Sequence, residues 1–368
     1  MPHLPLQPLY GKEEKLIIKL TVNTKRKSGL TIFSRDFFSL LGLLWIIFAF
    51  FISVFAYIII PDTSPDADQQ FPELALLPPG AKINFLHLPE QTQPQTTLKN
   101  TFFGTPVKDQ WIPVELSSDR KTFFQYGTSE TIQRPNVNLI LRTYLLGTDR
   151  LGRDVFSRLI LGTRTSMFIG TLAVCISLLI GVVIGAIAGY FKGWIDQLLS
   201  WIMNVLWTIP TLLMVLLLAL VFGKGITTVF IAVGLTMWVD VARMVRGQML
   251  SLREKEFAEA GIALGYSSWR IIFIHLLPNT IPSLLVIAAS NFASAILVEA
   301  GLSFLGFGVQ PPTPTWGNMI EAHKSDLMTG MPWLPIAPAL CIVSLVLAFT
   351  FAGQGLKSAF IDKNSPDE

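Results

Sequence analysis

Long uncharged apolar runs alternate with polar segments along most of this 368-residue chain. The first run, residues 37–60, is longer than the roughly 20 residues that a helix needs to cross a bilayer. Later runs predict spans at about 164–192, 198–222, 227–244, 281–304 and 326–357. The pattern therefore predicts an all-α polytopic membrane protein with six transmembrane helices.

Two of the later runs contain residues that affect how a helix packs in lipid. Pro210 interrupts the run 198–222. Membrane helices tolerate proline where neighbouring groups satisfy the freed carbonyl, commonly beside a cavity or hinge, so we place Pro210 on a candidate translocation path. Gly181, Gly185 and Gly189 recur every four residues in the preceding run. Small residues at this spacing let two helices approach closely, and we expect this face to contact a neighbouring helix.

The fifth run contains one acidic residue, Glu299, near its far end. A carboxylate inside a membrane is costly and usually faces protein or water. Glu299 therefore either influences the translocation path or holds the loop that follows it, and both interpretations stay open at this point.

Residues 61–146, between the first two runs, differ in kind because they are rich in Pro, Thr, Gln and Asn. Short β-like pieces separated by turn residues recur in this region. The pieces lie at 82–88, 101–103, 111–116, 121–126 and 137–141. We predict a β-rich extracytoplasmic insert, with a disordered loop as the alternative.

A polar segment, residues 251–278, separates the fourth and fifth runs. Ser251 and Glu254 have the spacing of a capping box, which predicts a helix start. Gly265 lies where a helix would need a C-cap. A second helix is predicted over 268–277, with a serine hydroxyl at its start and Pro278 as its end. The residues alone do not decide between a solvated connector and a docking surface.

The first of these two helices should be amphipathic. Phe257, Gly261 and Leu264 recur on one face at helical spacing. We therefore expect these three residues to lie on one side of the helix.

Basic residues predict which side of the membrane each loop occupies. The arm 1–36 is rich in Lys and Arg, which favours a cytoplasmic N-terminus. Six spans then place 251–278 and the tail 357–368 on the same side. Basic residues within 142–164 conflict with this rule, but the rule is most reliable for short loops, and the short loops agree.

Composition supports the membrane class and excludes several others. The chain is 51% hydrophobic and 14% charged, whereas soluble domains are about one-quarter charged. Cys175 and Cys341 lie within apolar runs, as small buried hydrophobic residues do. No basic face interleaved with aromatic residues predicts nucleic-acid binding.

Motifs for catalysis and metal binding are missing from the sequence. It contains no GxxxxGK[ST] phosphate loop, so the chain does not hydrolyse ATP by that route, and no HExxH, GxSxG or CxxC. Its four histidines are scattered without metal-ligand spacing. We expect no catalytic site, no metal site and no cofactor on this chain.

Two motifs beside the spans resemble a family of transport proteins. The pattern GTDxxGRDxxSRxxxGxRxS at 147–166 resembles the signature of dipeptide, oligopeptide and nickel permeases, and EAxLSFLGxGVQPPxPxWG at 299–317 resembles a second pattern of that branch. We interpret the first motif as an amphipathic interface helix with ion pairs at i,i+4. The signature residues are Gly147, Asp149, Gly152, Arg153, Asp154 and Arg158, with pairs Asp149–Arg153 and Asp154–Arg158.

The polar segment 251–278 resembles the EAA loop of ABC importer permeases, which presents a coupling helix to a partner ATPase. Gly261 replaces the usual second alanine of that loop. His275 replaces the usual isoleucine, as is common in the peptide branch. The resemblance assigns ATPase coupling to Glu259, Ala260, Gly261, Leu264, Gly265 and Pro278.

This resemblance covers residues 140–360 well and 30–60 weakly. It implies a C-like permease subunit of the inner (cytoplasmic) membrane, with the type I importer fold and five core helices within 147–356. The implied partners are a second permease chain in a heterodimer, two ATP-binding subunits that hold ATP and Mg, and an extracytoplasmic substrate-binding protein. Import of di- and oligopeptides is expected. A nickel or metal-chelate permease and a membrane receptor with a ligand-binding insert stay as alternatives.

Overall fold

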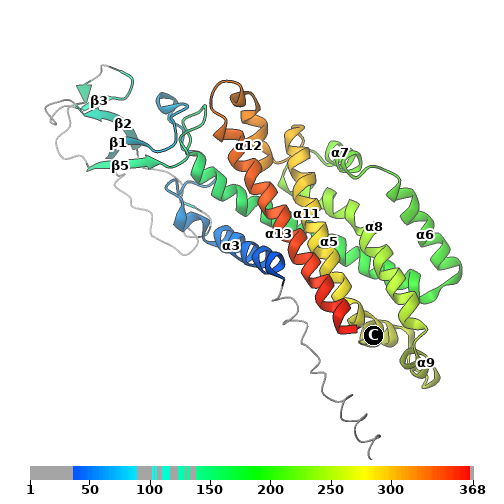
Figure 1. Ribbon diagram of the computed structural model, residues 1–368. Helices are drawn as coiled ribbons and strands as arrows, with labels where there is room; N and C mark the ends of the chain where they lie inside the picture. The colour runs from blue at the N-terminus through cyan, green and yellow to red at the C-terminus, as the bar shows by residue number, and fades with distance from the viewer. Residues whose placement is uncertain are drawn as a thin grey trace, which may run out of the picture.

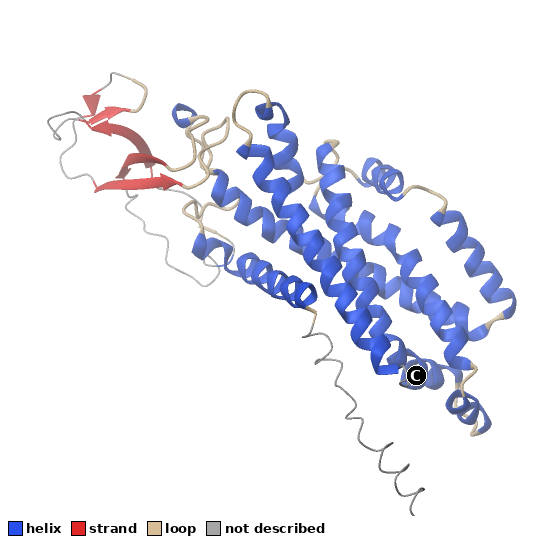
Figure 2. Cartoon of the chain, viewed as in Figure 1, coloured by secondary structure: helices blue, strands red, loops and turns tan. Residues whose placement is uncertain are grey.

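The computed structural model describes residues 36–88, 102, 104–105, 110–116, 123–128, 131–132 and 138–364. Long helices run side by side, and a small sheet lies at one end of them (Figures 1 and 2). Within the described residues, five helical segments are long and apolar enough to cross a membrane. They are α3 (Phe37–Ile59), α5 (Val155–Phe191), α8 (Ile226–Arg253), the continuous segment Ser268–Phe304, and α13 (Trp333–Asn364).

The third predicted span, residues 198–222, is built differently from the other five. Helices α6 (Gly193–Trp207) and α7 (Thr211–Phe222) are bent by 89° relative to each other. The run is therefore interrupted at Pro210, as predicted, but by a sharp bend between two separate helices; the bent pair can still count as one span. Pro210 is the N-cap residue of α7, a place where its missing N–H leaves no helical hydrogen bond unmade.

Two polar contacts join α6, the helix before the bend, to α8. Arg246 forms an ion pair with Asp196, with Nε and Oδ1 2.5 Å apart. Arg243 donates to the amide oxygen of Asn204 at 2.7 Å. Because these bonds hold α6 against α8, the direction of α6 is set by tertiary contacts rather than by the continuation of the apolar run.

Helix α5 is longer than predicted. It begins at Val155 instead of near Arg164 and continues without a break to Phe191. The expected interface helix and the second span are therefore one helix. At its far end, Gly181, Gly185 and Gly189 lie directly against α8, which confirms the close helix contact that their spacing predicts.

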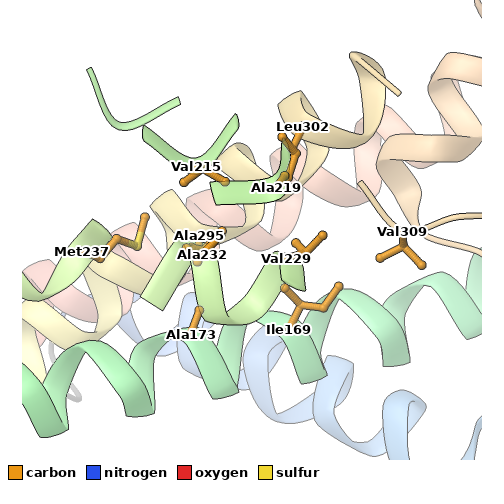
Figure 3. Packing of buried hydrophobic residues seen from close by; sticks show 11 residues of the cluster. Ile169, Ala173, Val215, Ala219, Val229, Ala232, Met237, Ala295, Leu302 and Val309 are labelled. Atoms are coloured by element: carbon orange, nitrogen blue, oxygen red, sulfur yellow. The ribbon is translucent and has the colours of Figure 1, made fainter. Parts of the chain in front are cut away.

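Small buried residues fill the space between the helices. One cluster contains Ile169 and Ala173 from α5, Val215 and Ala219 from α7, and Val229 and Ala232 from α8, with further residues from α11 (Leu277–Phe304). Figure 3 shows these side chains gathered between the ribbons. Alanine and valine at these positions allow the backbones to approach closely, which favours association of helices in lipid.

The insert contains a five-stranded antiparallel sheet, so the described residues support a β-rich insert over a disordered loop. The strand order is β4-β3-β2-β1-β5. The strands are β1 (Ala81–Leu88), β2 (Gln110–Leu116), β3 (Phe123–Gln125), β4 (Thr131–Ile132) and β5 (Asn138–Tyr144). Phe85 pairs with Ile140 of β5 and Pro113 of β2 and is fully buried against Leu74 and Tyr144. The piece predicted at 101–103 lies mostly outside the described residues.

The remaining helical elements are short and connect the long helices. They are η1 (Pro72–Leu74), α9 (Glu256–Ala263), α10 (Ser268–Arg270), the π-helix η2 (Ile271–Leu276), α12 (Trp316–His323) and η3 (Lys324–Leu327). Helix α9 lies at the end of the molecule opposite the sheet, as does the described end of α13 (Figure 1). Helix α13 continues past Lys357 to Asn364, so part of the predicted tail is helical. The predicted arm 1–36 lies outside the described residues except for its last residue.

Candidate functional site

Helix α9 projects from the end of α8 through a short turn at Glu254 and Lys255. The predicted capping box is wrong, because Ser251 lies in the last turn of α8 and the N-cap residue Lys255 makes no side-chain cap. Contacts with α5 extend α8 beyond the residue at which the next helix was predicted to begin. Arg253 donates to the carbonyl oxygen of Tyr190 on α5, and its guanidinium lies 5.1 Å from the centre of the Tyr190 ring.

The end of α9 has the geometry of a Schellman motif. Gly265 has a φ of +75°, a conformation that favours glycine. The N–H of Tyr266 donates to the carbonyl of Gly261 at 3.1 Å, and the N–H of Gly265 donates to that of Ile262 at 3.0 Å. These are the two bonds of the motif. Gly265 therefore follows the C-cap residue Leu264 and closes the helix, as its position in the sequence predicts.

Helix α9 buries a narrow face made of small residues. Ala258 and Gly261 are buried, and they pack near Ile271 and Tyr266. Of the three residues that share one face by their spacing, only Gly261 is buried, whereas Phe257 and Leu264 are 46% and 70% exposed. The cause is that α9 rests on η2 through its small residues, so that its larger apolar residues point outward.

The exposed side of α9 is the surface available for docking. Four of the residues predicted for coupling lie there: Glu259, Ala260, Leu264 and Gly265. Gly261 does not, because it faces the protein interior. Phe257 and Ile262 add exposed apolar area to this side. Sequence reasoning did not identify Ile262 as part of this exposed surface, because the sequence does not show which side of α9 is buried.

The second predicted helix does not end at Pro278. Pro278 is the second residue of α11, where proline is tolerated, and the chain is helical from Ser268 to Phe304. The expected hydroxyl cap is also wrong, since Ser267 occupies the N-cap without a side-chain bond. Residues Ile271–Leu276 form a π-helix, an element that occurs frequently at functional sites.

The signature motif forms a turn over residues 147–154 at the sheet end of the bundle, and only its second half, from Val155, belongs to the expected amphipathic helix. Gly147 and Gly152 have φ values of +74° and +72°. Asp149 accepts N–H bonds from Leu151 and Arg153, each 2.9 Å long. Asp154 is the N-cap of α5. The motif is therefore a structural element that fixes where α5 begins.

One of the two predicted ion pairs is present in this turn. Nε of Arg153 lies 2.7 Å from Asp149, and its Nη1 lies 2.9 Å from Asp68. The prediction of an ion pair between Asp154 and Arg158 is wrong. Arg158 instead reaches Asp68 at 3.6 Å, because Asp154 precedes the first helical residue and accepts the N–H groups of α5. Burial raises the pKa of the Asp154 carboxyl, and its hydrogen bonds from Ser157 and Phe156 oppose that shift.

Glu299 is buried in α11, where Ser303 donates to its Oε1 at 2.8 Å. Thr315 lies near this carboxyl, whose other oxygen, Oε2, is buried without a hydrogen-bond partner among the described residues. Thr315 forms a capping box with Asn318 at the start of α12. These contacts favour the interpretation in which Glu299 holds the following loop.

Two cavities lie on the sheet side of the described residues. One of about 450 Å³ is lined by Asp66, Asp68 and Trp111 among others. The other, of about 650 Å³, lies between α3 and α5 and includes Tyr57 and Arg164. Pro210 and Glu299 line neither of them, so these cavities do not place the two residues on one path. Among the described residues, no group of three or more His, Cys, Asp or Glu could hold a metal ion.

Comparisons with known proteins agree with this architecture. Residues 181–363 match the family described as binding-protein-dependent transport system inner membrane component. The oligopeptide transport system permease protein OppC of Bacillus subtilis is 40% identical over 222 residues, which cover 60% of this chain and 72% of that protein. The glutathione transport system permease protein GsiD of Pectobacterium atrosepticum is 38% identical over 253 residues, covering 69% and 81%.

A solved structure of the MetNI methionine ABC transporter in inward-facing conformations aligns with 17% identity and a TM-score of 0.47. The alignment covers 55% of this chain and 96% of that chain.

Proposed function

This chain belongs to the binding-protein-dependent transport system inner membrane component family, and we propose that it is the permease subunit of a peptide ABC importer, coupled to separate ATPase subunits through residues 251–278. The names of its relatives support a peptide cargo, because they are oligopeptide and glutathione permeases at 38% to 40% identity. The family description supports the inner membrane as its location.

The observation that carries the coupling role is the way α9 is presented. It is a short helix at the tip of α8, and it buries only Ala258 and Gly261. Its outer side combines the apolar side chains of Phe257, Ile262 and Leu264 with the carboxylates of Glu256 and Glu259. An exposed apolar patch with a polar edge is typical of a surface that binds another protein.

The transport step follows from the same arrangement. Closure of two ATPase subunits around ATP and Mg would move α9 as a unit. Because α8 leads directly into α9 and α11 follows it through η2, such a movement would tilt both spans together. Rigid-body tilting of packed helices is an established way to open a cavity alternately to the two sides.

The proposed assembly needs further subunits. A second permease chain would complete the translocation path as a heterodimer, and an extracytoplasmic binding protein would deliver peptide at the sheet end. ATP and Mg would be held by the ATPase subunits, with no cofactor on this chain.

The proposal is tested by a substitution at the turn after α9. In Gly265→Leu, a branched side chain must adopt a φ of +75°, which it strongly disfavours. We expect this variant to lose co-purification of the ATPase and uptake of peptides. The matched control is Gly127→Leu, because Gly127 has a φ of +73° and open space around it, and it lies in the insert. If Gly265→Leu keeps both ATPase binding and uptake, the docking role is wrong.

Cargo is tested in cells. A strain without this chain should stop growing on defined peptides as its nitrogen source and should recover when the gene is restored. Unchanged growth of the deletion strain on peptides would contradict the peptide assignment, whereas loss of nickel uptake would point to a metal-chelate cargo.

A further inference from the structure

Tyr266 joins helix α9 to the elements that follow it. Its N–H donates to the carbonyl of Gly261 at 3.1 Å. Its ring lies against the same glycine, since Cδ2 would be 3.6 Å from a Cβ added there. Tyr266 is thus held to α9 by both its backbone and its side chain.

The same ring contacts two side chains beyond the turn. The guanidinium carbon of Arg270, at the end of α10, lies 4.2 Å from the centre of the Tyr266 ring. The His275 ring, within η2, lies parallel to it at 5.8 Å with an interplanar angle of 8°. A cation over an aromatic ring and an aromatic pair at this distance are both attractive.

The π-helix explains how Arg270 and His275 can both reach one ring. In an α-helix of 3.6 residues per turn, residues five apart point about 140° away from each other. In a π-helix the hydrogen bonds join residues five apart, so that such residues lie nearly above one another. Ile271 and Leu276 have this spacing and are both fully buried in the cluster that also contains Ala258.

Few other contacts hold α9 in place. The helix packs against η2 more than against α8, and its N-cap residue Lys255 makes no side-chain cap. Gly265 contributes no packing, because a Cβ added to it would meet no atom within 4 Å. The ring of Tyr266 therefore spans the joint between α9 and the base of the span Ser268–Phe304.

We infer that Tyr266 is a positioning residue for energy coupling: its ring, held by Arg270 and His275, makes α9 and the inner end of α11 move as one body. This inference rests on the proposed function, because it assigns the transmission of movement to a residue behind the ATPase-docking side. Without the ring, α9 can still dock on the ATPase, but its displacement is absorbed at the Gly265 turn instead of reaching α11.

The test compares Tyr266→Phe, Tyr266→Ala and the control Trp269→Ala in the full importer, reconstituted with its ATPase subunits and binding protein. Trp269 lies in the same segment and is 54% exposed; its ring meets Phe191 edge to face and stacks on Phe273. Four quantities are measured for each variant: ATPase co-purification, thermal unfolding temperature, basal ATP hydrolysis, and peptide uptake per ATP from a tryptic digest of casein.

We expect Tyr266→Ala to keep ATPase binding, unfolding temperature and basal hydrolysis while its uptake per ATP falls by about fivefold or more, as mutations in a coupled network can produce. Tyr266→Phe keeps the ring and should match the wild type, as should Trp269→Ala. A further variant, Arg270→Met, removes the cation while keeping the side-chain length, and should show a smaller loss of uptake in the same direction.

Three results would overturn the inference. Normal uptake per ATP in Tyr266→Ala would show that the ring transmits nothing. Loss of ATPase binding in Tyr266→Ala would place Tyr266 in the docking surface instead. A defect in Tyr266→Phe equal to that of Tyr266→Ala would show that the hydroxyl is what matters. Failure of the wild-type chain to bind an ATPase would instead contradict the proposed function.

Discussion

Gly181 of helix α5 lies so close to Val241 of helix α8 that a Cβ atom added to the glycine would come within 2.5 Å of the valine Cβ. The same contact recurs along the helices, with Gly185 against Val245 at 2.8 Å and Gly189 against Met249 Cβ at 2.6 Å. Three successive glycines therefore set the distance between α5 and α8. Because α8 leads into α9, this contact also determines where the candidate docking helix sits.

The first prediction concerns this contact. Gly185→Leu should destabilise the protein by about 1–3 kcal/mol or more, because overpacking forces the helices apart. The measurement is the thermal unfolding temperature of the purified chain in detergent. Gly247→Leu is the matched control, since Gly247 lies in α8 with nothing within 4 Å of its missing Cβ. Equal unfolding temperatures for the two variants would contradict the close contact.

The second prediction concerns the buried ion pairs of the signature turn. The Arg153 side chain is 12% exposed and bridges Asp149 and Asp68. Arg153→Met should cost about 3–5 kcal/mol of unfolding free energy, because it leaves a buried carboxylate without its cation. Denaturant unfolding of the purified protein measures this loss.

An exposed pair on the same side of the molecule provides the comparison. Glu321 and Lys324 lie 3.2 Å apart and are 39% and 59% exposed. Glu321→Gln should change stability by less than about 1 kcal/mol, as exposed ion pairs do. A loss in Glu321→Gln as large as that in Arg153→Met would show that burial does not distinguish the two sites.

The third prediction concerns acid stability. Burial by itself would raise the pKa of the Asp326 carboxyl, but hydrogen bonds from Arg150 and His323 outweigh it and lower the pKa. A carboxyl with a lowered pKa stabilises the folded state above its ordinary value, and this stabilisation is lost as the pH falls through the folded value. Asp326→Asn should therefore be less stable than the wild type at neutral pH.

The difference between Asp326→Asn and the wild type should shrink below about pH 4, near the ordinary pKa of aspartate. Thermal unfolding temperatures at pH 7, 5 and 3 provide the measurement. A difference that stays constant over this range would mean that Asp326 does not titrate between folded and unfolded states.

The fourth prediction separates the two interpretations of Glu299. Glutamine at this position can still accept the hydroxyl bond from Ser303, whereas leucine cannot. If Glu299 holds the loop before α12, Glu299→Gln should keep both stability and peptide uptake, and Glu299→Leu should lose stability. We expect this outcome. Loss of uptake by a stable Glu299→Gln variant would instead show that the negative charge acts on the translocation path.

Sequence reasoning predicted the candidate site only in part. Gly265 was identified correctly, because a left-handed turn at a helix end strongly favours glycine. The predicted start of α9 was wrong, and the spacing of its apolar residues did not show which side of the helix is buried. Ser251 has a suitable side chain for capping, but a cap contributes only about 1 kcal/mol, and the packing of Met249 and Arg253 against α5 carries α8 beyond it.

From the residues alone, repeated membrane crossing could be predicted, and a β-rich insert was favoured over a disordered loop. Apolar runs long enough to span lipid have few alternatives to helix formation, and the glycine spacing of α5 predicts a contact face without reference to its partner. The tertiary structure alone decided the 89° bend between α6 and α7, the π-helix before α11, and the residues that α9 exposes. These features depend on contacts between segments far apart in the chain, such as Asp196 with Arg246 and Tyr190 with Arg253, whose combined effect exceeds the weak local preferences that a single sequence displays.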